Sequence, residues 1–131
     1  MTVPLLRVYG ITMNFSGLRA LNEVSFDMEE GAVTGIIGPN GAGKSTLFNV
    51  IAGDLTPTSG KVFFADEDIT GFSPDMICRA GISRTYQSVR PFLGLSVMNN
   101  LKVSMLYGRG GDKVPKSRVE PEILAILETV Q

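Results

Sequence analysis

The sequence contains no histidine and only one cysteine, Cys78. The lack of histidine excludes Ser–His and Cys–His catalytic pairs, histidine-ligated metals and a histidine-based pH switch. A single cysteine excludes an internal disulfide and is typical of a protein from a reducing compartment. The sequence also lacks any apolar run near the roughly 20 residues that a bilayer-spanning helix needs. Histidine chemistry, a disulfide scaffold and a membrane-spanning helix are therefore not expected.

No excess of basic charge is present. The sequence has 12 Lys and Arg residues against 13 Asp and Glu residues, a net charge of −1. A protein that binds along a nucleic-acid backbone needs a basic excess to neutralise phosphates, so we do not expect a nucleic acid as partner. The length of 131 residues, with 44% hydrophobic residues, suffices for one globular domain.

Most of the chain has patterns that are typical of regular secondary structure. Alternating or continuous apolar residues predict strands at 5–13, 24–28, 32–37, 62–64 and 82–86. Apolar spacing of three and four residues, together with cap residues, predicts helices around 47–51, between Ser73 and Gly81, after Ser96 and over 121–131. The glycines and proline of 108–120 predict a mobile loop or a linker.

The strongest motif is a glycine-rich loop that follows the short apolar run at 32–37. Residues 38–45 (GPNGAGKS) match the pattern G-x-x-x-x-G-K-[ST] at every defined position. The glycines let the backbone bend so that N–H groups and the start of a helix converge on an anion. Lys44 supplies a flexible positive charge for the β- and γ-phosphates, and the Ser45 hydroxyl is a hard oxygen ligand suited to Mg²⁺. The loop therefore predicts binding of a nucleoside triphosphate.

Residues 38–46 (GPNGAGKST) resemble the Walker A loop of ABC-transporter ATPases. Residues 81–87 (GISRTYQ) follow at the place where this family has its Q-loop. The sequence is most similar to the ATP-binding subunits of branched-chain amino acid importers (the LivG type). That closer resemblance is carried by 68–71 (DITG), 84–87 (RTYQ) and 89–92 (VRPF). The resemblance to the ABC-transporter ATPases covers essentially the whole chain.

The resemblance implies an α/β fold, a P-loop NTPase core of the ABC ATPase type. We expect an antiparallel β-subdomain at 1–31, the core from the Walker A loop to the Q-loop at 32–87, and the beginning of a helical subdomain at 88–131. A largely parallel sheet would surround the phosphate loop. The sequence has no LSGGQ-like signature, no apolar run ending in Asp-Glu (Walker B) and no switch histidine. We therefore interpret it as the truncated, N-terminal part of one ABC nucleotide-binding domain.

The resemblance also implies roles for individual residues, with ATP and Mg²⁺ as cofactors. Phe15 would stack on adenine, and Gln87 would approach Mg²⁺ and the attacking water. Lys44 and Gln87 are then the catalytic candidates, and Ser45 and Gln87 the metal ligands. The residues expected to contact the nucleotide are Phe15, Gly38, Pro39, Asn40, Gly41, Ala42, Gly43, Lys44, Ser45 and Thr46.

Partners follow from the same resemblance. Residues 88–100 would face the coupling helices of transmembrane permease subunits, and a second ABC ATPase subunit would complete a homo- or heterodimer. The protein would lie in the cytoplasm on the inner face of the cell membrane. The expected function is to couple ATP binding and hydrolysis to substrate import, with branched-chain amino acids as the expected cargo.

Two other functions stay open. The first is a non-catalytic nucleotide-binding or assembly fragment, since the groups that would polarise water for hydrolysis are missing. We expect the 131-residue chain alone to bind nucleotide weakly and to hydrolyse it negligibly. The second is a small-molecule kinase, which should lack the placements of Phe15 and Gln87.

Several of these residues also have plain structural interpretations. Phe15 suits packing beside a hairpin turn, Gln87 a solvated strand end, and 88–100 a surface loop that leads into a helix. The acidic residues at 66–68 suit a solvated turn, and Cys78 suits an inert buried thiol.

Overall fold

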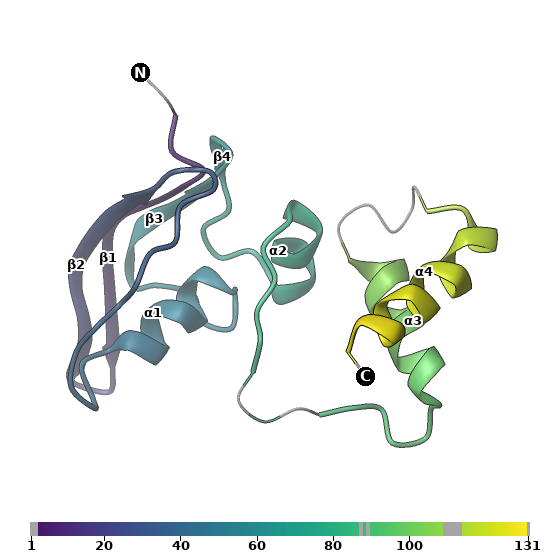
Figure 1. Cartoon of the computed structure of the whole chain (residues 1–131). Coiled ribbons are helices and arrows are strands. Elements are labelled where there is room, and N and C mark those ends of the chain that lie inside the picture. The colour runs from purple at the N-terminus through teal and green to yellow at the C-terminus, as the bar shows by residue number, and fades with distance from the viewer. Residues whose placement is uncertain (1–2, 87, 89, 109–113, 131) are drawn as a thin grey trace. The chain divides into compact units, whose positions relative to one another are not determined.

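The computed structural model describes residues 3–86, 88, 90–108 and 114–130 (Figure 1). The chain divides into two compact units, Met1–Ile77 and Cys78–Gln131. The three-part division predicted at residues 31 and 87 stays a prediction.

The first unit is built on a four-stranded antiparallel sheet with the order β2-β1-β3-β4. A two-residue turn, Ser16-Gly17, joins the two long strands, and both of its residues have positive φ. The strands predicted at 5–13, 24–28 and 62–64 are confirmed, and the sheet extends past residue 31 because β3 pairs with β1. The strands are β1 (Leu6–Phe15), β2 (Leu18–Met28), β3 (Ser59–Phe64) and β4 (Glu67–Asp68).

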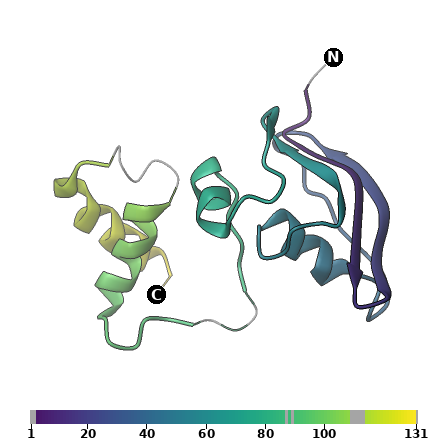
Figure 2. The ribbon, with the colours of Figure 1, turned by 180° about the vertical axis from the view of Figure 1, so that it is seen from behind.

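Helix α1 (Lys44–Ile51) lies beside this sheet in both ribbon views (Figures 1 and 2). It buries one apolar face, as the spacing of its residues predicts. The helix ends at Ile51, and Gly53 follows the C-cap Ala52 with a φ of 79°, which only glycine adopts readily. The side chains buried in this unit come from the sheet, from α1 and from the segments that follow them: Leu6, Val8, Ile11, Thr12, Met13, Leu21, Leu47, Val50, Ile51, Ala52, Val62, Phe64, Ile69 and Ile77.

Helix α2 (Pro74–Ala80) has the bounds that its cap residues predict. Pro74 is its first residue, where the missing N–H costs nothing, and the Ser73 carbonyl accepts the first helical bond from Ile77. Gly81 follows the helix with a positive φ of 116°. The predicted start and stop signals are thus confirmed.

In the second unit, α3 (Val97–Tyr107) packs on α4 (Lys116–Thr129). Ser96 caps α3 as predicted, because its hydroxyl accepts a hydrogen bond from the Asn99 amide at 3.2 Å. Val119 and Ile123 of α4 are buried, and Lys102 pairs with Glu120 between the helices.

The predicted start of this last helix at Pro121 is wrong, and so is the predicted loop through residue 120. Helix α4 begins at Lys116 and includes Pro121. Proline removes one N–H from a helix interior, but burial of Val119 and Ile123 on the preceding and following turns favours continuing the helix across it.

The strands predicted at 32–37 and 82–86 are also wrong, and with them the parallel sheet. No described residue in either segment is in a strand, and every described strand pair is antiparallel. Val33 and Ile37 are fully exposed. Strands need neighbours that pair their N–H and C=O groups, and no described strand pairs with either segment.

Candidate functional site

The glycine-rich loop turns tightly and leads directly into α1. The Ala42 amide donates to the Pro39 carbonyl at 3.2 Å, which closes a turn. Gly41 and Gly43 have φ values of 83° and 84°, a region that side chains with a Cβ rarely adopt. These two positive values reverse the backbone so that the loop ends where Lys44 begins the helix.

Gly43 fits closely against the β1–β2 hairpin. A Cβ at this position would lie 2.5 Å from the Ala20 carbonyl oxygen and 2.8 Å from a Leu21 methyl carbon. Only glycine allows this approach, since both the positive φ and the space exclude a side chain. The approach fixes the start of α1 beside β2, and so brings the loop to the hairpin.

The start of α1 carries uncompensated positive charge. The helix has no acidic residue in its first turn and no side-chain cap, so its first N–H groups are available to an anion. The Lys44 Nζ donates to the carbonyl oxygens of Gly38 at 2.7 Å and Pro39 at 2.6 Å. Both acceptors are neutral, and among the described residues no carboxylate pairs with Lys44. The arrangement attracts a negatively charged group.

The loop and the hairpin together line one open cleft of about 400 Å³. Phe15 ends β1, its Cα pairs with that of Leu18 at the start of β2, and its side chain is 40% exposed. An aromatic face therefore lies in the same cleft as the Lys44 ammonium. The lining residues are Phe15, Leu18, Arg19, Ala20, Asn40, Gly41, Gly43, Lys44, Ser45 and Thr46.

Most of the predicted site residues thus come together, although their individual roles stay predictions. Gly38 and Pro39 contribute carbonyls that accept from Lys44, and Ala42 closes the turn. Ser45 is exposed in the first turn of α1, so its hydroxyl is open to a ligand. Gln87, predicted as a catalytic and metal-binding residue, lies outside the described residues.

Three residues of the cleft escaped the sequence analysis: Leu18, Arg19 and Ala20. They follow the hairpin turn, so the pairing of Phe15 with Leu18 and of Asn14 with Arg19 brings them beside the aromatic residue. The short turn at Ser16-Gly17 was the signal that could have found them. The Arg19 Nη1 donates to the side-chain oxygen of Asn22 at 3.0 Å. Because this partner is neutral, the Arg19 guanidinium adds a second positive charge to the cleft.

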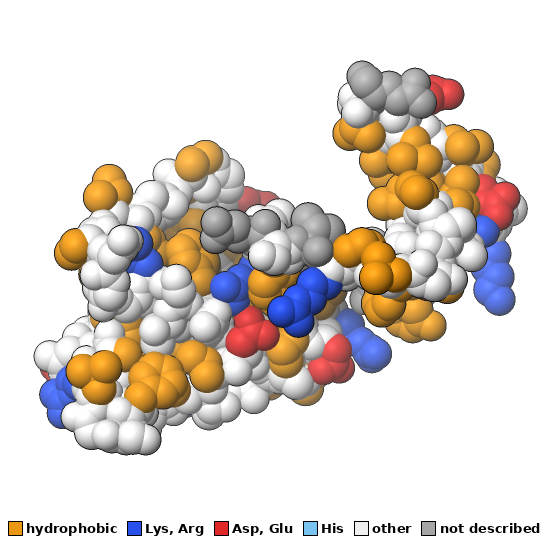
Figure 3. All heavy atoms as spheres, turned by 90° about the horizontal axis from the view of Figure 1, so that it is seen from below, with side chains coloured by type: hydrophobic (Ala, Val, Ile, Leu, Met, Phe, Trp, Pro, Cys, Tyr) orange, Lys and Arg blue, Asp and Glu red, His pale blue; other side chains and the backbone are white. Residues whose placement is uncertain are grey.

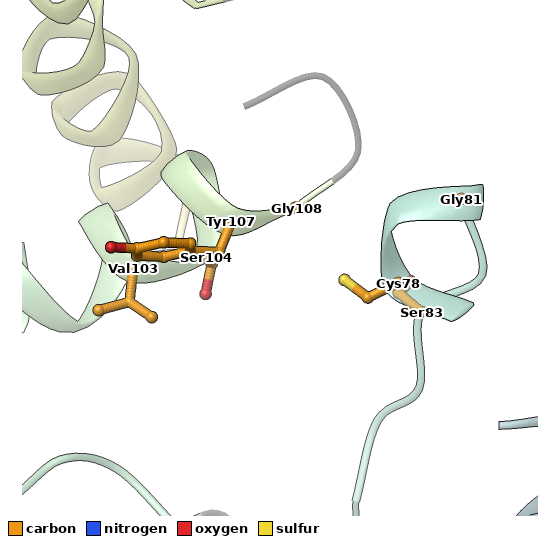
Figure 4. A pocket seen from close by; sticks show the side chains of 7 residues that line it. All are labelled: Cys78, Gly81, Ser83, Val103, Ser104, Tyr107 and Gly108. Atoms are coloured by element: carbon orange, nitrogen blue, oxygen red, sulfur yellow. The ribbon is translucent and has the colours of Figure 1, made fainter. Parts of the chain in front are cut away.

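A second depression, of about 480 Å³, lies in the second unit and suits a triphosphate less well. Val103, Ser104 and Tyr107 of α3 line it together with Cys78, Gly81, Ser83 and Gly108 (Figure 4). No Lys, Arg, Asp or Glu side chain lines it. It is the larger of these two spaces, but its lining has no positively charged side chain to pair with a phosphate.

Asp68, the last of the acidic residues at 66–68, has structural partners. The Lys61 Nζ contacts the Asp68 carboxylate at 2.8 Å, and Thr70 donates to the same carboxylate from its hydroxyl and its amide. The hydrogen bond from Lys61 and those from Thr70 lower the pKa of Asp68 to about 2. Across the described part of the chain, no group of three His, Cys, Asp or Glu side chains is placed to hold a metal.

Comparison with known proteins decides the family. The family model for ABC transporters matches residues 21–131. The chain belongs to the ABC transporter family. The resemblance inferred from the Walker A and Q-loop motifs and the predicted fold class are both confirmed.

Among curated ABC relatives, the chain is 42% identical over 104 residues to the high-affinity branched-chain amino acid transport ATP-binding protein LivG of Salmonella typhimurium. It is 44% identical over 104 residues to the corresponding protein BraF of Pseudomonas aeruginosa. Each match covers 79% of this chain and 41% of the relative. The chain therefore spans about two fifths of the length of the curated relatives it matches.

A solved ABC cassette has the same fold. The crystal structure of the ADP conformation of an ATP-binding cassette of an ABC transporter is 42% identical, with a TM-score of 0.71. The match covers 80% of this ABC chain and 41% of that one. Within the described residues, no helix is both long and apolar enough to cross a bilayer.

Proposed function

We propose that this chain binds ATP in the cleft between the phosphate loop and the β1–β2 hairpin. We further propose that the complete protein couples ATP hydrolysis to import through a membrane transporter, with branched-chain amino acids as cargo. One observation carries the binding proposal: Lys44, the loop and Phe15 line a single cleft. The cargo rests on the names of the LivG and BraF relatives.

The triphosphate would occupy the loop end of the cleft. The Lys44 Nζ donates to the carbonyl oxygens of Gly38 at 2.7 Å and Pro39 at 2.6 Å. Phosphate oxygens would replace these two carbonyls as partners of the ammonium. An anionic oxygen is a better partner for an ammonium than a neutral carbonyl. The first N–H groups of α1, which have no side-chain cap, add donors to the same phosphates.

The adenine would lie on Phe15 at the hairpin end. The exposed part of the ring is a platform on which a base can stack, and such stacking contributes on the order of 1–3 kcal/mol. The small-molecule kinase that the motif also allowed gives no reason for an aromatic residue here, so this placement supports the transporter ATPase.

Mg²⁺ would be held by the Ser45 hydroxyl, whose position in the first turn of α1 fits an oxygen-preferring cation. When bound, the ion supplies charge neutralisation to the phosphates during transfer to water. Gln87 remains the predicted residue for positioning that water. We expect the 131-residue chain by itself to release negligible phosphate from ATP.

The partners that we propose are transmembrane permease subunits, which residues 88–100 would face, and a second ATPase subunit. Support comes from membership of the ABC transporter family and from the names of the curated relatives, which are transport ATP-binding proteins. The protein would then work at the inner face of the membrane.

Calorimetric titration of the chain with ATP and Mg²⁺ tests the binding proposal. We expect measurable binding that Lys44→Ala weakens at least roughly tenfold, because the phosphates lose their charged partner. Lys116→Ala, which removes an exposed lysine at the start of α4, is the matched control and should bind like the wild type. Equal affinity in the wild type and Lys44→Ala would refute the proposal.

A further inference from the structure

Asn100 makes an unusual set of contacts for a side chain on a helix surface. Its Oδ1 accepts a hydrogen bond from the Phe92 amide at 2.8 Å. The two N–H groups of its Nδ2 are shared among the carbonyl oxygens of Phe92, Leu95 and Ser96, at 3.1, 3.2 and 3.0 Å. One side chain of α3 therefore holds both ends of the loop at 92–96.

The loop at 92–96 is also closed by its own backbone. The Leu95 amide donates to the Phe92 carbonyl at 2.9 Å, and Ser96 then caps α3. The backbone of this loop is thus fixed at its start, at its turn and at its end. Its conformation is set before any partner arrives.

The fixed loop exposes apolar side chains. Phe92 is 57% exposed and Leu93 is 93% exposed. Exposed hydrophobic side chains (orange) occur at several places on the molecular face that Figure 3 shows. From Pro91 to Leu101 no residue is charged. Large apolar side chains on an ordered, neutral backbone are typical of contacts that a partner covers, since burial removes them from water without a cost of ordering.

We propose that Asn100 is a positioning residue, which holds the loop at 92–96 so that Phe92 and Leu93 form a preset contact for a transmembrane subunit. This inference rests on the proposed transport function, which supplies the partner. The neutral, apolar character of the loop fits an apolar contact surface on that subunit better than a charged surface, because no ion pair is available to a charged partner.

The experiment measures binding of the protein to its detergent-solubilised transmembrane subunits. We expect Asn100→Ala and Leu93→Ser each to weaken binding at least roughly tenfold. The double variant should bind no more weakly than the weaker single variant, because both changes destroy the same contact. ATP affinity should stay at the wild-type value throughout.

Two further measurements separate positioning from a general structural role. Hydrogen exchange at the Phe92 and Leu95 amides should accelerate in Asn100→Ala and stay unchanged in Leu93→Ser. The matched control is Thr129→Ala, which removes another side-chain hydrogen bond to a helix carbonyl in the same unit, at 3.0 Å from Ala125. It should leave subunit binding unchanged. If Asn100→Ala does not fold, Leu93→Ser still carries the test, since its side chain is almost wholly exposed.

The outcomes distinguish this inference from the function beneath it. A wild-type protein that does not bind the transmembrane subunits refutes the proposed coupling and this inference with it. Wild-type binding that Asn100→Ala or Leu93→Ser leaves within twofold refutes the positioning role alone. Purely additive losses in the double variant also refute it, because they would mean two separate contacts.

Discussion

The strands of the β1–β2 hairpin and the segment at 32–37 have similar apolar patterns, but only the hairpin residues form strands. Ile11 of β1 is completely buried, whereas Ile37 is fully exposed. The hairpin strands are joined by a two-residue turn, so each finds its neighbour at once. The segment at 32–37 has no strand beside it among the described residues. An apolar pattern thus indicates that a strand needs a pairing neighbour. The sequence predicts that neighbour reliably only when it is adjacent along the chain, as in a hairpin.

The largest effect expected from this comparison concerns the two isoleucines. Ile11→Ala should lower the free energy of unfolding by about 2–5 kcal/mol, because it leaves a cavity in a packed core. Ile37→Ala should change it by less than about 0.5 kcal/mol. Urea unfolding followed by circular dichroism measures both. Similar losses for the two variants would mean that 32–37 is buried in solution.

The next comparison concerns Gly43, the last glycine of the phosphate loop, and Gly35, which precedes the loop. Gly43→Ala should lower the free energy of unfolding by about 1–3 kcal/mol and abolish ATP binding, because its Cβ would collide with the Ala20 carbonyl at a positive φ. A Cβ at Gly35 would meet nothing within 4 Å, so Gly35→Ala is the control. Thermal unfolding and calorimetry check both. Unchanged binding in Gly43→Ala would contradict the packing of the loop on the hairpin.

The hairpin end of the cleft gives a smaller effect. Phe15→Ala should weaken ATP binding by about 1–3 kcal/mol, the range expected for a lost stacking contact. Tyr9→Ala removes an exposed aromatic from the same strand outside the cleft, and its affinity should match the wild type. Fluorescence titration with a labelled ATP measures both, and equal affinities for Phe15→Ala and wild type would exclude stacking.

The smallest effect is electrostatic. The pKa of Asp68 is lowered from 3.8 to about 2, so its pairing with Lys61 stabilises the fold above about pH 4. That contribution is lost as the pH falls toward 2 and the carboxylate is protonated. Lys61→Met should raise the pKa of Asp68, as followed by NMR titration. The pKa of Glu120, which Lys102 lowers, should not move.

Sequence reasoning predicted the features that depend on neighbours along the chain. The caps at Ser96, Pro74 and Gly81 are local, and so is the turn geometry of the phosphate loop. Its failures depend on distant contacts. Pro121 was expected to begin a helix, but burial of Val119 and Ile123 extends α4 across it.

The residues that line the cleft likewise fall into those that the sequence predicts and those that it does not. The residues of the loop could be predicted because the motif is continuous in sequence. Leu18, Arg19 and Ala20 could not be found by a motif, since only the register of the hairpin brings them to the loop. Gly43 belongs to both groups, because it is part of the sequence motif and also fits against the Ala20 carbonyl of the hairpin.

The central claim is that the phosphate loop and the hairpin form one ATP site. Titration of the ¹⁵N-labelled chain with ATP and Mg²⁺, followed by amide chemical shifts, tests it most directly. We predict that the amides of residues 40–46 and those of residues 15–20 shift together, with one dissociation constant. Shifts confined to the loop, or two different dissociation constants, would contradict the account.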